Sequence, residues 1–457
     1  MDVDILIKNG RIVTHSEEFE GAVAIKGEKI AAIVSDPTGI NAKKTIDAKG
    51  NVVMPGNIDP HVHIGLFMDF DTDMKSETGA AAAGGTTTIM HCLLEKESML
   101  KRFPVRKESV EKYSYIDVAF YAAVMSDVHI EEIEKTMDLG ITSFKFLMGY
   151  KGKAGEEIGI LGADSRVLFL GFEKLAKLGG LPMIHAEHIE LVYAIEPRYK
   201  HENTLKTWWD ARPNVCEEID MRIAASIAEF TGSRLYQVHT SVGSFAEIYK
   251  PFRERGVTIY VETCPHYLVL DAYGKMLKNP LLAKINPPIR GPEDCAGLWK
   301  GLQDGTIDCI GTDSCNSMWA DKWKDGSIWN ITLDFSSVET MLPLLISEGY
   351  HKGRLTLPQI VKYCSYNTAH IHGLAPRKGI MAPGADADIT IVDLNKKKVI
   401  TPDIMHSIAE WNVYEGWEIT GWPIMTLVRG QVVYEDEKLV GNPGYGKFVP
   451  CKPQPLK

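Results

Sequence analysis

The side chains that could do chemistry begin with two histidines separated by a single residue, His61 and His63. They close an apolar run that starts at Val52, and on a strand two side chains at this spacing point to the same face. A His-x-His pair by itself fits a chance pair as well as a metal site. Its meaning therefore depends on which other polar residues share its surroundings.

Further polar side chains lie within or at the end of other apolar runs. Lys145 lies inside one of them, and His185, His239 and Asp313 end three later ones. Imidazole and carboxylate groups are the ligands of Zn²⁺ and related divalent ions. If the strands that carry these groups are parallel, the groups meet at one rim, and the pattern then predicts a metal site that includes the histidine pair.

Lys145 raises a separate question, because it lies in an otherwise apolar predicted strand. Burying an ammonium group is costly unless the group is paired or neutralised. A buried ion pair is one solution, and a side chain that reaches the rim is another. A third is reaction with CO₂ to N-carboxylated lysine, an anion that could bridge two metal ions and so help them activate one shared hydroxide.

The elements that must position these groups are short apolar runs that alternate with amphipathic helical segments. Eight strand candidates cover residues 52–63, 86–92, 117–124, 143–148, 182–186, 234–240, 257–264 and 306–313. This alternation predicts a parallel sheet, and eight strands favour a closed (β/α)₈ TIM-type barrel. An open doubly wound sheet is the rival, but no Gly-x-Gly-x-x-Gly follows the first strand.

The two ends of the chain differ from the middle and resemble each other. Both alternate apolar and polar residues around turn glycines, a pattern typical of hairpins. We predict a small β-sandwich domain built from residues 1–53 and 376–457, which ends in an irregular arm from Gly441. Residues 54–375 form the predicted catalytic barrel.

Composition excludes several classes of protein. The 457 residues are 45% hydrophobic and 24% charged, as in globular proteins. The net charge of −10 gives no electrostatic support to a nucleic-acid partner, and no apolar stretch is long enough to span a membrane. The N-terminus lacks a signal-peptide pattern, and the eight cysteines are scattered. We expect reduced thiols and a cytoplasmic protein.

Taken together, the candidate residues resemble the metal-binding set of the amidohydrolase superfamily, and nearly the whole chain resembles its dihydropyrimidinase/hydantoinase branch. The motifs that carry the likeness lie at 140–151, 211–217, 287–290, 384–388 and 414–423. The resemblance implies a cytoplasmic homotetramer that hydrolyses a cyclic amide or imide. It also implies two divalent ions, with zinc expected, bridged by Lys145 as N6-carboxylysine.

Three residues receive roles in hydrolysis by a metal-bridging hydroxide. Asp313 can take the proton of the attacking hydroxide and pass it to the departing nitrogen, besides binding metal. Tyr150 lies in the loop above the strand of Lys145, where its hydroxyl could stabilise the oxyanion. Asn286 could bind the imide edge of a substrate, or serve as a turn residue before two prolines.

Two departures from the branch leave the substrate open. Ser314 and Asn316 flank a cysteine in an unusual combination, and Asn286 stands where dihydroorotases also have asparagine. A dihydroorotase- or allantoinase-like enzyme is the alternative, which a rim arginine or an extra asparagine would favour. A non-catalytic assembly protein of the same fold is a further alternative, although such proteins lose metal ligands that this chain keeps. The loop at 318–334 has no assignment.

Four polar residues near the predicted strand ends receive no role in metal binding or catalysis. His91, His188 and His266 are expected to be packing, surface or supporting residues. Cys315 lacks the separate base that a thiol mechanism needs.

The sequence also gives an expectation about the substrate. Tyr150 and Asn286 offer neutral hydrogen bonds, no arginine can be placed at the rim, and Arg290 is expected to face away from it. A substrate carboxylate would then lose its hydration without compensation.

We predict that hydantoin or dihydrouracil is hydrolysed with a kcat/KM at least ~100-fold above that of dihydroorotate. Side-by-side kinetics check this, and a preference for dihydroorotate would reveal an arginine that the sequence does not place.

Overall fold

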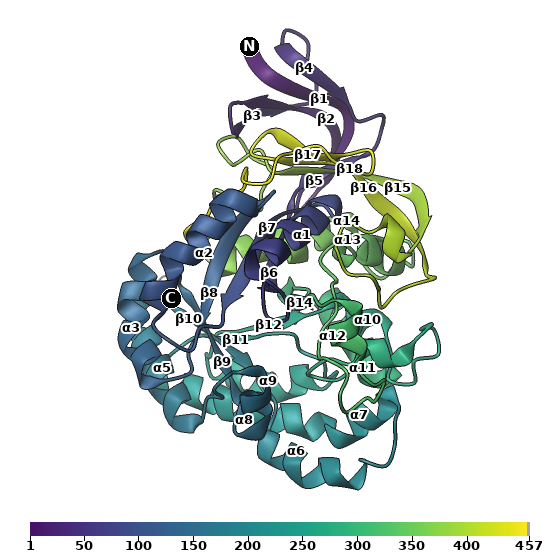
Figure 1. Cartoon of the computed structure of the whole chain (residues 1–457). Coiled ribbons are helices and arrows are strands. Elements are labelled where there is room, and N and C mark those ends of the chain that lie inside the picture. The colour runs from purple at the N-terminus through teal and green to yellow at the C-terminus, as the bar shows by residue number, and fades with distance from the viewer. Residues whose placement is uncertain (455–457) are drawn as a thin grey trace.

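Two β-sheets organise the chain, and a ring of helices surrounds one of them (Figure 1). The computed structural model describes residues 1–454, with 157 and 158 described through their backbone only. The last three residues of the predicted range 376–457 lie outside the described part. None of the helices in the described part is long and apolar enough to cross a membrane.

The first sheet is parallel and closes on itself. Its strands are β6 (Asn57–His63), β7 (Thr86–Leu93), β8 (Asp117–Ala123), β9 (Ser143–Leu147), β10 (Leu181–His185), β11 (Leu235–Gln237), β12 (Ile259–Thr263), β13 (Cys309–Ile310) and β14 (Ser314–Cys315). Neighbours in sequence pair in order from β6 to β13, and β14 returns to pair with β6. The predicted barrel is thereby confirmed.

The last barrel strand is divided, which the sequence did not predict. The strand predicted over 306–313 contains β13, which pairs with β12, but β14 lies after its end and pairs with β6. Between the two halves the backbone turns at Asp313, whose φ is +50°. The barrel therefore closes through a broken strand, and the break lies at a predicted site residue.

The first predicted strand, 52–63, is also divided. It splits at Gly56 into β5 (Val52–Pro55), which joins the other sheet, and β6 of the barrel. A Cβ atom at Gly56 would lie 2.2 Å from the Cγ2 atom of Thr87. Only glycine permits the backbone to pass between the two sheets at this point.

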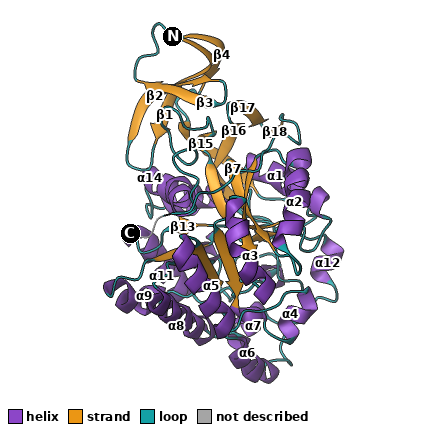
Figure 2. Cartoon of the chain, turned by 90° about the vertical axis from the view of Figure 1, so that its left-hand side faces the viewer, coloured by secondary structure: helices purple, strands orange, loops and turns teal. Residues whose placement is uncertain are grey.

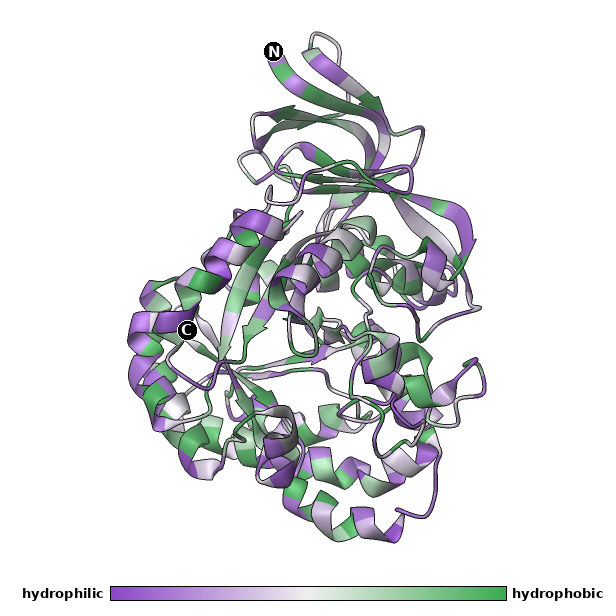
Figure 3. Cartoon of the chain, in the orientation of Figure 1, coloured by the Kyte–Doolittle hydropathy of each residue, from purple (hydrophilic) through white to green (hydrophobic). Residues whose placement is uncertain are grey.

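Helices cover the outside of the barrel (Figure 2). The α-helices of the described part are α1 (Phe70–Ala83), α2 (Met99–Tyr113), α3 (Asp127–Asp138), α4 (Lys153–Ile158), α5 (Ser165–Leu178), α6 (Ile189–Ile195), α7 (Leu205–Ala211), α8 (Asn214–Thr231), α9 (Phe245–Glu254), α10 (Pro265–Val269), α11 (Pro292–Asp304), α12 (Trp319–Trp323), α13 (Met341–Leu344), α14 (Leu357–Val361) and α15 (Asn367–Ile371). Because helices lie outside and side chains fill the inside, β7 and β8 are buried along their whole length. After Asp117, β8 is accordingly apolar (Figure 3), whereas β7 begins with three buried threonines.

The second sheet is mixed and draws its strands from both ends of the chain. They are β1 (Asp2–Val13), β2 (Glu18–Lys26), β3 (Lys29–Val34), β4 (Asn41–Asp47), β5, β15 (Ile389–Val399), β16 (Glu418–Val428), β17 (Gln431–Glu435) and β18 (Lys438–Leu439). Residues of the N-terminal half such as Ile25 share one apolar core with Ile391 and Leu427 of the C-terminal half. The two halves thus pack together, as expected for a β-sandwich.

The segment after Gly441 is irregular, as predicted, but it packs against the barrel. Phe448 forms a β-bridge with Val118, and Val449 and Cys451 are buried. The described part of this segment, up to residue 454, therefore lies beside the barrel, far from the N-terminus (Figure 1).

A buried ion cluster joins the barrel to the second sheet. Asp117 of β8 accepts from Lys378 at 2.5 Å and from Arg429, and all three side chains are fully buried. Lys378 also contacts Asp388 at 2.6 Å and Asp386 at 3.1 Å. Since two cations lie among the three carboxylates, these acidic residues form ion pairs and leave no role for a metal ion.

We predict that Asp117→Asn lowers the free energy of unfolding by about 3–5 kcal/mol, because it leaves a buried cation without its partner. Chemical denaturation followed by tryptophan fluorescence measures the change. The matched control is Glu111→Gln, which removes a carboxylate from an exposed i,i+4 pair with Lys107 and should have little effect. Equal stability of the two variants would contradict a stabilising role for the cluster.

Candidate metal centre

The predicted site residues meet at the mouth of the barrel. His61 and His63 end β6, Lys145 lies in β9, and His185 ends β10. His239 follows β11, and Asp313 lies at the break after β13. The carboxyl ends of parallel strands meet at one rim, which is where barrel enzymes place their chemistry. A cavity of about 1210 Å³ opens above this point, and its lining includes each of these residues except His61.

One half of the cluster surrounds Lys145. The Nζ atom of Lys145 lies 2.6 Å from Nε2 of His61 and 3.3 Å from Nε2 of His63. An Asp313 carboxylate oxygen lies 3.1 Å and 3.3 Å from the same two nitrogens. The four groups therefore share one small volume.

The other half is a pair of imidazoles. Nδ1 of His185 lies 2.8 Å from Nε2 of His239, and the opposite nitrogen of each ring has no hydrogen-bond partner. His239 adopts a φ of +37° in the left-handed region, which a non-glycine residue rarely does. The backbone is held in a strained conformation that aims the ring at the centre.

Burial keeps these imidazoles neutral. It lowers the pKa of His61 to about 3 and that of His63 to about 4, and the charge of Lys145 adds to the effect. The pKa of His185 falls to about 3 for the same two reasons. Burial by itself raises the pKa of Asp313, but the neighbouring imidazoles outweigh it and hold this pKa well below its usual range. Near pH 7 the centre thus offers imidazole lone pairs and a carboxylate.

A buried glutamate orients one of the rings. An oxygen of Glu262 accepts from Nδ1 of His61 at 2.8 Å and from the backbone N–H of His239 at 2.9 Å. Its other oxygen accepts from the hydroxyl of Tyr236 at 2.8 Å. With its proton on Nδ1, His61 presents the lone pair of Nε2 to the centre, as a metal-binding histidine does.

A second buried carboxylate, Asp59, fixes the broken strand. It accepts from the backbone N–H groups of His61 at 3.1 Å and Thr312 at 3.0 Å, and from the hydroxyl of Thr312 at 2.5 Å. These bonds join β6 to the residue before Asp313. The ligand-bearing ends of the first and last strands are thereby held together.

This arrangement suits a divalent metal ion. One ligand atom each from His61, His239 and Asp313 lies within 4.8 Å of the others, and all three residues are buried. Imidazole nitrogens and a carboxylate oxygen that converge in this way are the ligand atoms that zinc and related divalent ions prefer. The residues present therefore fit a metal centre.

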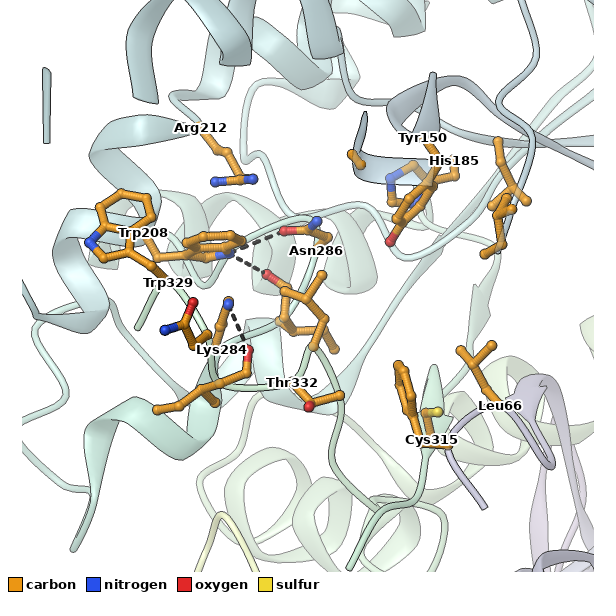
Figure 4. A pocket seen from close by; sticks show the side chains of 18 of the residues that line it. Leu66, Tyr150, His185, Trp208, Arg212, Lys284, Asn286, Cys315, Trp329 and Thr332 are labelled. Atoms are coloured by element: carbon orange, nitrogen blue, oxygen red, sulfur yellow. Dashed lines mark hydrogen bonds between the residues drawn. The ribbon is translucent and has the colours of Figure 1, made fainter. Parts of the chain in front are cut away.

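Tyr150 and Asn286 lie beside this centre (Figure 4). The ring of Tyr150 packs 4.9 Å from that of His185, and burial raises the pKa of its hydroxyl, which stays a donor. The Asn286 carbonyl oxygen accepts from Nε1 of Trp208 at 3.1 Å. Both residues line the cavity, so they can contact a bound molecule.

The expectation of a rim without arginine is wrong. Arg212 and Lys284 both line the cavity, although each is more than nine-tenths buried. The sequence did not reveal this because both residues come from segments between strands, whose course depends on tertiary packing. Arg290 does face away, since it binds Glu217 at 3.1 Å and Ser241 at 3.0 Å below the surface.

The two unusual residues after Asp313 point away from the cavity. Ser314 accepts from the backbone of Ser337 at 3.0 Å, and Asn316 donates to Glu77 at 3.1 Å. The unassigned loop 318–334 does reach the cavity, because its residues 329–333 form part of the wall. The loop, rather than Ser314 or Asn316, shapes the space above the centre.

The four polar residues that received no role in metal binding or catalysis have the following surroundings. His188 pairs with Asp220 at 2.9 Å, and His91 accepts from the backbone N–H of Ile64 at 3.1 Å. His266 is fully buried against Phe335, with both ring nitrogens unpartnered. Cys315 borders the cavity, but burial raises the pKa of its thiol well above the usual value, so it is no thiolate.

Sequence reasoning missed Glu262 and Asp59 as supporting residues. Each is a carboxylate within an otherwise apolar predicted strand, the signal that singled out Lys145. Applied to every barrel strand, the cost of burying a charge would have found both.

The family model described as "Amidohydrolase family" matches residues 215–433. A D-hydantoinase of Geobacillus stearothermophilus is 35% identical, over 97% of this chain and 96% of its own. An L-hydantoinase of Paenarthrobacter aurescens is 30% identical, over 98% of each chain.

Solved structures show the same similarity to hydantoinases and dihydropyrimidinases. The chain superimposes on a dihydropyrimidinase from Brevibacillus agri with a TM-score of 0.91, at 30% identity over 98% of each chain. It superimposes on an L-hydantoinase from Arthrobacter aurescens with a TM-score of 0.92, at 28% identity over 98% of this chain and all of the other. The likeness thus covers the barrel and the second sheet together.

Proposed function

Since the chain belongs to the hydantoinase/dihydropyrimidinase family of amidohydrolases and hydrolyses cyclic amides, we propose that its substrate is a cyclic ureide or imide of the hydantoin or dihydropyrimidine type. The observation that carries the proposal is the convergence of four imidazoles, Lys145 and Asp313 beneath a cavity that Tyr150 and Asn286 line. The test is to incubate the metal-loaded protein with hydantoin and to measure the N-carbamoyl amino acid that ring opening produces.

We assign two zinc ions to the centre. His61 and His63 would hold one, His185 and His239 the other, and Asp313 with N6-carboxylated Lys145 would complete the set. Bound there, the ions would supply a nucleophile at neutral pH and polarise the scissile carbonyl. The position of Lys145 supports its carboxylation. Its Nζ atom lies only 2.6 Å from the Nε2 atom of His61, and a positive charge there would repel a metal ion bound to that nitrogen.

The protein's own groups move the proton and hold the ring. Asp313 would accept the proton of the attacking hydroxide at its carboxylate and pass it to the departing ring nitrogen. The hydroxyl of Tyr150 donates to the oxygen that becomes negative. The amide of Asn286 contacts the imide edge, and Trp208 fixes its orientation.

The dihydroorotase-like alternative gains from one observation. A rim arginine was the feature expected to favour it, and Arg212 lines the cavity. The ~100-fold preference for hydantoin over dihydroorotate, which was predicted from a rim without arginine, therefore loses that support. The assignment of the ring to the hydantoin or dihydropyrimidine type remains, because Tyr150 and Asn286, beside the centre, offer only neutral hydrogen bonds.

We further propose that residues 1–53 with 376–457 form one domain and that residues 54–375 form the catalytic domain.

The family likeness supports a homotetramer. The eight unpaired cysteines are consistent with a reducing compartment such as the cytoplasm. Light scattering of the purified protein checks the number of subunits.

We predict that metal-loaded wild-type protein holds two divalent ions per chain and that Lys145→Ala holds fewer and loses activity. Short-chain carboxylic acids should restore part of the activity, because they replace the bridging anion. Metal analysis and rates with added acetate or propionate measure both effects. Lys300→Ala, at an exposed position, is the matched control and should not respond to acid. Unmodified Lys145 in the mass of the active protein would refute the bridge.

We predict that Asp313→Asn lowers kcat by at least ~100-fold while the protein keeps much of its metal, because the amide still offers an oxygen but cannot carry the proton. Steady-state kinetics and metal analysis on the same sample separate the two effects. Asp138→Asn, on the exposed face of α3, is the control. Activity within about tenfold of wild type would move the proton transfer to another group.

A further inference from the structure

The outer part of the cavity contains a tryptophan held between two basic side chains (Figure 4). The guanidinium carbon of Arg212 lies 3.5 Å from the centroid of the Trp208 ring, and the Nζ atom of Lys284 lies 4.2 Å from it. Arg212 is 6% exposed and Lys284 is 3% exposed. This stack of Arg212, Trp208 and Lys284 belongs to no part of the proposed metal centre.

The basic groups of the stack have spare hydrogen-bonding capacity. Lys284 donates to the carbonyl of Ile331 at 2.6 Å, and no carboxylate of the described residues forms an ion pair with it. Arg212 pairs with Glu196 at 3.0 Å through one terminal nitrogen, whereas its Nε and Nη1 atoms lack a hydrogen-bond partner. Buried basic groups normally find an anion, so the stack lacks part of its counter-charge.

The acidic groups nearby do not fill this gap. Glu196 also binds Lys200 at 2.5 Å, and Glu187 lies 3.7 Å from Arg212, beyond hydrogen-bond distance. Apart from Lys145 and Asp313, the cavity is lined by five basic side chains and three acidic ones. The cavity is thus positive within a chain whose net charge is −10.

The charge of Lys284 responds to what binds beside it. Burial, with Arg212 next in effect, lowers its pKa to about 6. A bound carboxylate would oppose this shift and bring a proton to Nζ, so that a charge-assisted hydrogen bond forms on binding.

The stack is directly connected to the residues that would hold the ring. Nε1 of Trp208 donates to Asn286 at 3.1 Å, and Lys284 lies two residues before Asn286 on the same segment. Trp329 of the loop 318–334 packs 5.7 Å from Trp208 and closes the outer side. A ring seated against Tyr150 and Asn286 therefore has the stack within its immediate surroundings.

We propose that Arg212 and Lys284, spaced by Trp208, bind a carboxylate on the substituent of the substrate ring, so that the preferred substrate is a cyclic ureide with an acidic side chain. The inference rests on the proposed function and specifies its substrate class.

An isosteric pair of substrates tests the subsite. Racemic 5-(2-carboxyethyl)hydantoin and 5-(2-carbamoylethyl)hydantoin differ only in whether the side chain ends in a carboxylate or an amide. We expect wild-type protein to favour the carboxylate by at least about tenfold in kcat/KM, mainly through KM. In Lys284→Met the ratio should fall to within about twofold of unity, and Lys284→Arg should restore most of it. Lys177→Met, at an exposed position outside the cavity, should keep the wild-type ratio.

The possible failures are distinct. If metal-loaded wild-type protein opens unsubstituted hydantoin but favours the amide or neither side chain, the subsite is refuted and the proposed function stands. If it opens no hydantoin at all, both fail. If Lys284→Met keeps the full preference for the carboxylate, the proposed subsite of Arg212 and Lys284 is refuted. Because the ratio compares two substrates on one protein sample, a loss of folded protein cannot imitate the expected result.

Discussion

The site depends on two carboxylates buried inside the barrel. Glu262 binds a ring nitrogen of His61 and the backbone of His239, and Asp59 binds the backbone on both sides of the barrel closure. Burial raises the pKa of each to about 7, so both would be costly without these donors. The hydrogen bonds that offset the free energy of burying these carboxylates form only when the segments that carry His61, His239 and Asp313 are in place. The arrangement of the site residues therefore forms only together with the native barrel.

The sequence predicted the barrel, the participation of both chain ends in the second sheet, and the convergence of six site residues. It could do so because apolar runs identify strands, and the polar residues at their ends must share a rim when the strands are parallel. It failed where position depends on tertiary packing. Arg212 and Lys284 come from segments between strands, and nothing local states that both flank Trp208.

The division of the predicted strand 52–63, and the place of β14 beyond the predicted strand 306–313, have a similar origin. Apolar patterning shows that 52–63 and 306–313 are buried, but not which neighbour each residue pairs with. Gly56 and Asp313 mark the changes of partner. A glycine or a left-handed residue within an apolar run is therefore the local feature to examine, although only the pairing itself identifies its purpose.

The broken last strand has a consequence for the biosynthesis of the protein. The β14 residues pair with β6, about 250 positions earlier in the chain, and Asp313 takes its place through that closure. While the ribosome is still extending the chain, His61 and His63 have emerged long before the residue that completes their site. A nascent chain therefore exposes an unfinished edge at β6 for most of its synthesis. The proposed metal-binding residues can therefore come together only in chains that have been translated past Cys315.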